Sequence, residues 1–132
     1  MTPIIASTKT SQTQEISELH WLSSIEEALS DQSKLLTMVD LYADWCAACK
    51  ELELITFSDP LVKSELSKFK LVKVDFTQLD DQATSITEKY NVLGLPCILF
   101  LNPDGQEISG SRINGFLEPQ DFIKHLKAKI PT

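Results

Sequence analysis

Residues 35–52 read LLTMVDLYADWCAACKEL and decide the fold, because they join an apolar run to a pair of cysteines and then to a helix-forming stretch. Residues 35–42 have the length and apolar content of a strand that is covered on both faces. The residues from Cys46 to about Thr56 include several good helix formers. The segment therefore predicts that Cys46 lies where a buried strand gives way to a helix.

The spacing of Cys46 and Cys49 suits redox chemistry at such a junction. The unpaired amides and partial positive charge of a helix N-terminus stabilise a thiolate on Cys46. Three-residue spacing places Cys49 on the same helix face, within reach of a disulfide. Cys46 can then attack a substrate disulfide, and Cys49 can displace the product from the mixed disulfide. Zinc sites also use this spacing, so a zinc-binding module using Cys46, Cys49 and Cys97 is an alternative from another class.

The rest of the chain alternates between strand and helix patterns, as in an α/β domain whose sheet is covered on both faces. The last two strands are expected to form an antiparallel hairpin around the turn at residues 102–105. The expected elements are a short strand at residues 19–22, a helix capped within the Ser23-Ser24-Ile25-Glu26 capping box, a helix that restarts at Asp59-Pro60, a strand at residues 69–76, a helix from Asp80 or Asp81 to about Tyr90, a strand at residues 97–101, its partner strand near residues 107–113, and a final helix from Pro119.

Composition excludes several classes of protein. The chain has 132 residues and 42% hydrophobic residues, enough for one compact domain. Its net charge of −7 argues against binding to nucleic-acid phosphates. No apolar run approaches the roughly 20 residues that span a bilayer. Residues 1–17 are mostly polar and lack the pattern of a secretory signal, so we expect a flexible lead-in or linker there and a folded domain over residues 18–132.

Residues 39–50, VDLYADWCAACK, resemble the active-site segment of the thioredoxin family, and Gly94-Leu95-Pro96 resembles that family's cis-proline loop. Residues 56–60 and 91–96 are similar to the corresponding segments in the C-terminal periplasmic domain of the DsbD family of thiol:disulfide interchange proteins. The resemblance covers about residues 19–130. It implies a thioredoxin-like three-layer fold, with a central mixed sheet, helices on both faces, and a C-terminal antiparallel hairpin plus helix.

The resemblance also implies a function. In the DsbD family this domain is a disulfide reductase that takes electrons from a membrane-embedded domain and passes them to an N-terminal periplasmic domain, which serves isomerase and cytochrome c biogenesis. By resemblance, the chain is a periplasmic domain of an inner-membrane protein. Its partners are then disulfide-containing domains of the same full-length protein, and it uses no cofactor and no metal. A freestanding thioredoxin or a cytochrome-maturation reductase is the alternative within the same chemistry.

Two acidic residues are candidates for tuning the cysteines. Asp40 lies in an apolar strand, where a carboxylate usually has a partner or a task. The resemblance places Asp40 beneath the cysteine pair as a proton relay to Cys49; the alternative is a hydrogen-bonded structural aspartate. Glu53 follows Cys49 by four residues and shares its helix face, although it could simply be exposed. Lys50 lies on that face too and opposes the acids.

The acids predict the direction of the reaction. Strong oxidants of this kind stabilise their reduced thiolate and so lower the pKa of the attacking cysteine. Negative neighbours oppose the thiolate and remove that oxidising bias. We therefore expect a reductant, with an apparent pKa of Cys46 above 8 in the reduced domain. A thiolate absorbance titration with a midpoint below 7 would contradict this.

Three residues are candidates for substrate docking. Trp45 is expected to shape the docking surface beside the cysteines. The resemblance implies that the peptide bond between Leu95 and Pro96 is cis, so that the Leu95 backbone can pair with an extended substrate strand.

The remaining candidates have simpler interpretations. Cys97 begins an apolar strand, where we expect it to be buried as a small hydrophobic residue. The alternative is that its thiol acts as a further reactive group near the Cys46–Cys49 pair. His20 and His125 lack metal-like spacing to the cysteines, which indicates surface or packing roles.

Overall fold

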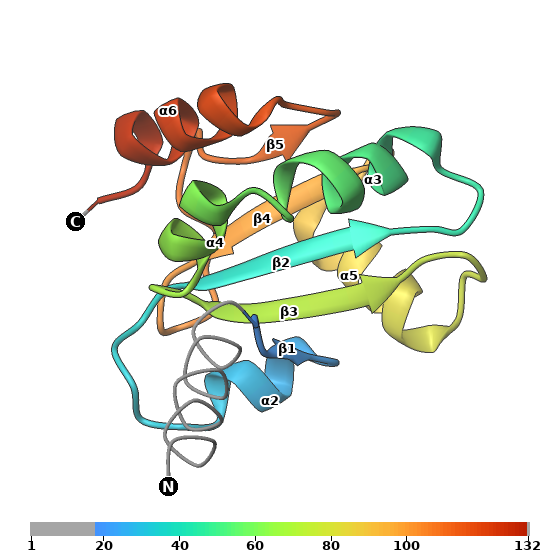
Figure 1. The fold of residues 1–132 in the computed structure, drawn as a ribbon. Coiled ribbons are helices and arrows are strands. Elements are labelled where there is room, and N and C mark those ends of the chain that lie inside the picture. The colour runs from blue at the N-terminus through green and yellow to red at the C-terminus, as the bar shows by residue number, and fades with distance from the viewer. Residues whose placement is uncertain (1–17, 132) are drawn as a thin grey trace, which may run out of the picture.

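The computed structural model describes residues 18–131 and places a five-stranded sheet between two layers of helices (Figure 1). The expected linker at residues 1–17 lies outside the described residues. The sheet has the order β1-β3-β2-β4-β5. Its strands are β1 (Trp21–Leu22), β3 (Lys70–Asp75), β2 (Thr37–Tyr42), β4 (Cys97–Leu101) and β5 (Ile113–Asn114). Strand β3 is parallel to β1 and β2, whereas β4 is antiparallel to β2 and β5, so the predicted mixed sheet is confirmed.

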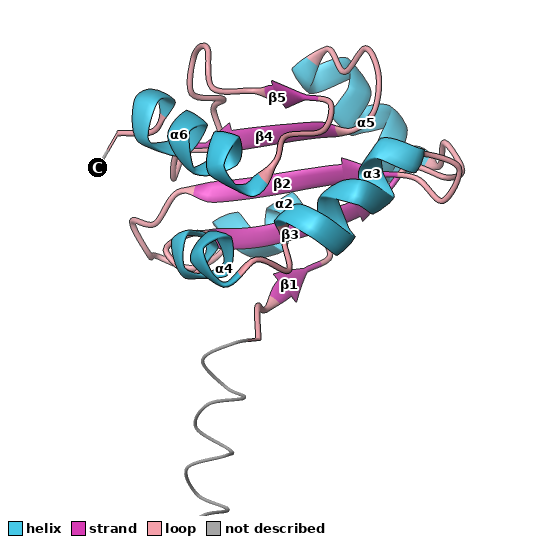
Figure 2. Ribbon diagram, turned by 45° about the horizontal axis from the view of Figure 1, so that its top comes forward, coloured by secondary structure: helices cyan, strands magenta, loops and turns pink. Residues whose placement is uncertain are grey.

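Helices cover both faces of the sheet, as expected (Figure 2). One face carries α2 (Ile25–Leu29) and α5 (Asp81–Tyr90). The other face carries α3 (Ala47–Glu51), the π-helix η1 (Leu52–Thr56), α4 (Pro60–Leu66) and α6 (Pro119–Lys129). Within residues 18–131, no helix has both the length and the apolar character needed to cross a membrane.

The predicted helix starts are confirmed, with small shifts. Asp59 caps α4 by accepting hydrogen bonds from the amides of Leu61 and Val62, and Pro60 occupies the first turn. Asp80 rather than Asp81 caps α5. Ser24 caps α2, and its side-chain oxygen accepts a hydrogen bond from the amide of Glu27. The capping interaction therefore joins Ser24 to Glu27, one residue later than the predicted pairing of Ser23 with Glu26.

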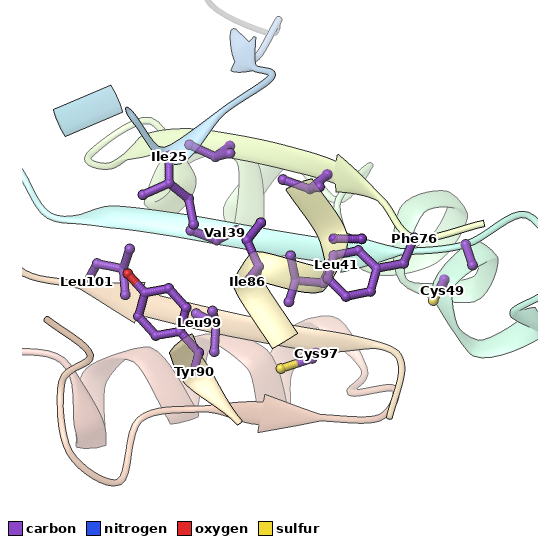
Figure 3. Close-up of a cluster of buried hydrophobic side chains, with 14 of the residues drawn as sticks. Ile25, Val39, Leu41, Cys49, Phe76, Ile86, Tyr90, Cys97, Leu99 and Leu101 are labelled. Carbon is purple, nitrogen blue, oxygen red and sulfur yellow. The ribbon is translucent and has the colours of Figure 1, made fainter. Parts of the chain in front are cut away.

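Alternation along β2 divides the core into two clusters. Val39 and Leu41 pack beneath α2 and α5 in the cluster shown in Figure 3. Met38 packs on the opposite face, in the cluster that η1, α4 and α6 contribute to. Because side chains alternate along a strand, Asp40 points to the same face as Met38. Strand β2 thus places one carboxyl group beneath the helix that follows it.

Two predicted elements differ from the structure. The expected partner strand at residues 107–113 is wrong: β5 is only Ile113–Asn114, and Glu107 makes an isolated bridge with Leu101. Between them the chain turns away from the sheet through Gly110, whose φ of 72° is left-handed, and this turn interrupts the ladder. The helix predicted to run to Thr56 is continuous, but its second half, η1, is a π-helix rather than an α-helix.

Candidate active site

Cys46 and Cys49 form a disulfide at the start of α3, directly beyond the end of β2. Their Cα atoms are 5.3 Å apart. Cys46 is the N-cap residue of α3, and the amide of Cys49 donates a hydrogen bond of 3.2 Å to its Sγ. Both side chains are buried, with 6% and 7% of their surface exposed. The structure therefore confirms the predicted strand-to-helix junction and brings the two sulfurs together.

Asp40 is buried on the face of the sheet that α3 and η1 cover. Only 4% of the residue is exposed, and none of the hydrogen bonds or ion pairs among residues 18–131 involves its carboxyl group. Burial raises the pKa of Asp40 to about 7; the positive charge of Lys73 opposes this rise, and the negative charge of Glu53 adds to it. The carboxyl group is thus able to gain or lose a proton near neutral pH.

Lys73 is a residue of this site that the sequence interpretation missed. It lies on β3 in register with Asp40, and its Nζ is 3.2 Å from Oε1 of Glu53. The same ammonium group lies over the rings of Trp21 and Tyr42, at 5.5 and 5.1 Å from their centroids. A lysine within the alternating strand of residues 69–76 was the available signal, but its register against β2 could not be read from the sequence.

Glu53 extends from η1 to Lys73, and its side chain is exposed. The ion pair lines an open hollow of about 410 Å³, which is also lined by Trp21, Phe57 and Lys63. The structure therefore links Glu53 to Asp40 through Lys73, a connection that its spacing from the cysteines did not predict. Lys50, which was expected to oppose the acids, is exposed and makes no ion pair within the described part of the chain.

Trp45 directly precedes Cys46, and Leu95 packs against the apolar cluster that contains both cysteines. Trp45 is 68% exposed, Leu95 is half-buried and Pro96 is buried. The Leu95–Pro96 bond is cis, as the resemblance implied. Trp45 and Leu95 line a hollow of about 360 Å³ together with Leu79 and Leu93.

The sequence analysis did not single out Leu79 and Leu93, which are 74% and 89% exposed in the structure. The signal available in the sequence was that both are large apolar residues in expected loops. With Trp45, they form an exposed apolar surface next to the cysteines, which we call the leucine surface.

Cys97 is fully buried, as expected, in the same apolar cluster as Cys46 and Cys49 (Figure 3). Burial raises the pKa of its thiol to about 11; Arg112 opposes the rise, and Glu107 and Asp40 add to it. This thiol is therefore neutral at physiological pH.

The histidines do not contribute to the site. His20 is exposed, whereas a ring nitrogen of His125 is 2.6 Å from the carbonyl oxygen of Ser111 and its ring packs near Phe100. Across residues 18–131, no three His, Cys, Asp or Glu side chains gather as they would around a metal ion. The structure lends no support to the zinc-module alternative.

Comparison with known proteins gives matches that agree with this geometry. The model of the thioredoxin-like domain family matches residues 23–130. The thiol:disulfide interchange protein DsbD of Tatumella citrea is 43% identical over 80% of this chain and 18% of its own length. The DsbD protein of Escherichia coli K12 is 39% identical over 94% of this chain and 22% of its own length. The chain therefore spans about a fifth of these relatives.

A solved structure supports the fold. The C-terminal domain of Neisseria meningitidis DsbD, in its oxidised form, superposes with a TM-score of 0.66 at 20% identity. The match covers 92% of this chain and 95% of that one.

Proposed function

The chain belongs to the family of thioredoxin-like domains, and from this premise we propose that it is a thiol-disulfide oxidoreductase that reduces protein disulfides through Cys46 and Cys49. The observation that carries the proposal is the Cys46–Cys49 disulfide at the start of α3. A reversible disulfide at a helix N-terminus is the reacting group of this chemistry. The similarity to DsbD proteins over most of the chain supports the same activity.

The proposed reaction begins with both cysteines reduced. The Cys46 thiol releases its proton, and the thiolate attacks one sulfur of the substrate disulfide. A Cys46–substrate bond forms while the substrate disulfide breaks, and the other substrate sulfur leaves as a thiolate. Cys49 then loses its proton and attacks Cys46 Sγ, which releases the second substrate sulfur. Two electrons pass to the substrate, and the protein ends with the disulfide seen in the structure.

Asp40 is proposed as the group that accepts the proton of Cys49. It lies on the sheet face beneath α3, and its pKa of about 7 lets it act as a base near neutral pH. Burial raises that pKa most, while Lys73 lowers it and Glu53 adds to the rise. Their ion pair borders the open hollow beside Trp21, which offers a route for the proton to reach solvent.

We propose that the direction of electron flow is reductive. Negative charge on Asp40 and Glu53 opposes a stable thiolate, so it offsets the stabilisation of the reduced form that would make the protein an oxidant. The similarity to DsbD supports the further proposal that the electrons come from a membrane-embedded domain and pass to a periplasmic partner domain, and that this chain acts in the periplasm. The leucine surface and Leu95 would contact that partner.

The test uses a peptide whose single cysteine carries a thionitrobenzoate group in a mixed disulfide. The proteins are reduced and freed of reductant, and Cys97→Ser is the common background. We expect the protein with both active-site cysteines to release thionitrobenzoate and then the free peptide, and to finish with the Cys46–Cys49 disulfide. Cys49→Ser should stop at a Cys46–peptide adduct visible by mass spectrometry, because the second attack is lost.

The control is Cys46→Ser, which removes the attacking sulfur and should release no thionitrobenzoate above the background rate. Release by Cys46→Ser at the full rate, or peptide maps that never link Cys46 to Cys49, would contradict the proposed function. Equilibration in a buffer that contains both reduced and oxidised glutathione in a known ratio tests the direction. A reductant has a lower reduction potential than this buffer, so it should remain largely oxidised.

A further inference from the structure

Arg112, the one arginine of the chain, makes a bidentate ion pair with Glu107 next to β5. Its Nε donates to Oε2 of Glu107 at 2.8 Å, and its Nη2 donates to Oε1 at 2.7 Å. Both side chains are about three-quarters buried, with 22% and 25% of their surface exposed. The charges are therefore largely neutralised by each other, and the guanidinium is held in a fixed orientation.

The same guanidinium also holds the end of α5. Nη1 donates to the carbonyl oxygen of Asn91 at 3.2 Å, and Nη2 donates to that of Tyr90. These carbonyls lie at a helix C-terminus, where Asn91 has the left-handed φ of 53° and no further helical amides follow. Arg112 thus fixes the point where the chain leaves α5 and enters the loop of residues 91–96.

The other end of that loop is held by the same short segment. The amide of Gly115 donates to the carbonyl oxygen of Pro96 at 3.3 Å, and Asn114 pairs with Cys97. Between these anchors, the amides of residues 93–95 make no hydrogen bond to any described residue. Residues 112–115 therefore brace a loop whose middle presents free backbone groups and the exposed Leu93, which lines the same hollow as Trp45.

We propose that Arg112 is a positioning residue for the loop of residues 93–95, and that it sets how well an extended polypeptide disulfide docks. The inference rests on the proposed function and deepens it. Arg112 acts through the loop and not on the sulfurs. A substrate with polypeptide on both sides of its cysteine needs the braced loop, whereas a small disulfide that only reaches Cys46 does not.

The geometry requires arginine and not only positive charge. One planar guanidinium makes four hydrogen bonds in different directions, two to Glu107 and two to the end of α5. A lysine ammonium at this position has three donors at a single point and cannot span both partners. Arg112→Lys should therefore keep the ion pair with Glu107 and lose the tether to α5.

The experiment compares two mixed disulfides with the same thionitrobenzoate leaving group: one on N-acetylcysteine and one on an eight-residue peptide with a central cysteine. For Arg112→Met, the rate constant with the peptide should fall by about tenfold, because small misplacements of a docking element slow a reaction strongly. The rate with N-acetylcysteine should stay within about twofold. Arg112→Lys should lie between Arg112→Met and the wild type for the peptide alone.

Lys70→Met is the matched control. Lys70 also ties a helix-end carbonyl, that of Ala28, and a carboxylate, that of Asp31, but it lies at the opposite end of β3 from the disulfide. The Lys70→Met variant should be less stable than the wild type but should react with both mixed disulfides at the wild-type rates. If Arg112→Met leaves the peptide rate unchanged, or lowers both rates equally, the inference is overturned.

Two further variants keep the outcome decisive. Should Arg112→Met fail to fold, Arg112→Lys and Glu107→Gln carry the same comparison. If these variants change the rates with both substrates by the same factor relative to the wild type, the inference is overturned. A wild type that reacts with neither substrate instead refutes the proposed function, so the two failures are distinguishable.

Discussion

The two faces of the sheet beneath the disulfide differ in the ionisable groups that they bury. On the face covered by α3, η1 and α6, Asp40 lies near the ion pair of Lys73 and Glu53. On the face covered by α2 and α5, Cys97 is surrounded by apolar side chains (Figure 3). Asp40 pairs with Ile98, the neighbour of Cys97, so both groups lie at the same end of the sheet.

Burial raises the pKa of both groups, but with different consequences. Asp40 reaches a pKa of about 7, where a carboxyl group exchanges protons at neutral pH. Cys97 reaches about 11, where a thiol stays protonated. The ion pair borders an open hollow, whereas Cys97 has no exposed surface. Of these two buried groups, only Asp40 has a pKa near neutral pH, as its proposed role in proton transfer requires.

Asp40→Asn should give the largest effect, as a pH-dependent gain in stability of the oxidised protein. An unfolded aspartate has a pKa of about 3.9. Because the folded value is raised to about 7, the wild type is fully stabilised below about pH 4 and loses stability as pH rises through 7. Asparagine does not ionise, so the variant should gain about 3–4 kcal/mol at pH 8 and little at pH 4.

Urea unfolding at both pH values measures this difference. An equal gain at pH 4 and pH 8 would show that the pKa of Asp40 is the same in the folded and the unfolded protein, so that burial does not raise it. The α3 face would then have no group that titrates near neutral pH to distinguish it.

Lys73→Met should give the next largest effect, on the titration of Asp40. The lysine favours the ionised carboxylate, so its removal should raise the pKa of Asp40 by about one unit. Carbon-13 NMR of the Asp40 carboxyl group measures the midpoint. Lys63→Met is the matched control, since Lys63 lines the same hollow and makes no ion pair within residues 18–131. Equal shifts in both variants would assign the effect to general charge and not to Lys73.

Local patterns were sufficient to predict most of the fold. The apolar run before the cysteines predicted β2, and Asp59-Pro60 predicted the start of α4, because strand burial and helix capping depend on neighbouring residues. The hairpin was predicted poorly because alternation cannot show where a chain leaves the ladder. In the structure, the turn through Gly110 leaves only Ile113–Asn114 as β5.

The residues of the candidate site also divide into those that a local sequence pattern reveals and those that it does not. Cys46, Cys49 and Asp40 could be singled out because each stands out within a short segment. Lys73 and Arg112 could not, since their partners lie on other elements: Lys73 meets Glu53 through the register of β3 with β2, and Arg112 meets the end of α5. A local sequence pattern cannot show contacts that depend on strand register or on the packing of segments that are distant in the sequence.

Cys97→Ala should give the smallest effect on redox chemistry, although the thiol shares a cluster with the active-site cysteines. A neutral, fully buried thiol neither attacks a disulfide nor changes the local charge. The equilibrium of the Cys46–Cys49 pair with glutathione should shift by less than about 10 mV, where 30 mV corresponds to 1.4 kcal/mol. Cys97→Ser serves as the second variant, because it also removes the thiol but buries a hydroxyl in apolar surroundings. A shift above about 30 mV that is equal in both variants would show that the thiol itself takes part, and the two faces would then both contribute to the chemistry.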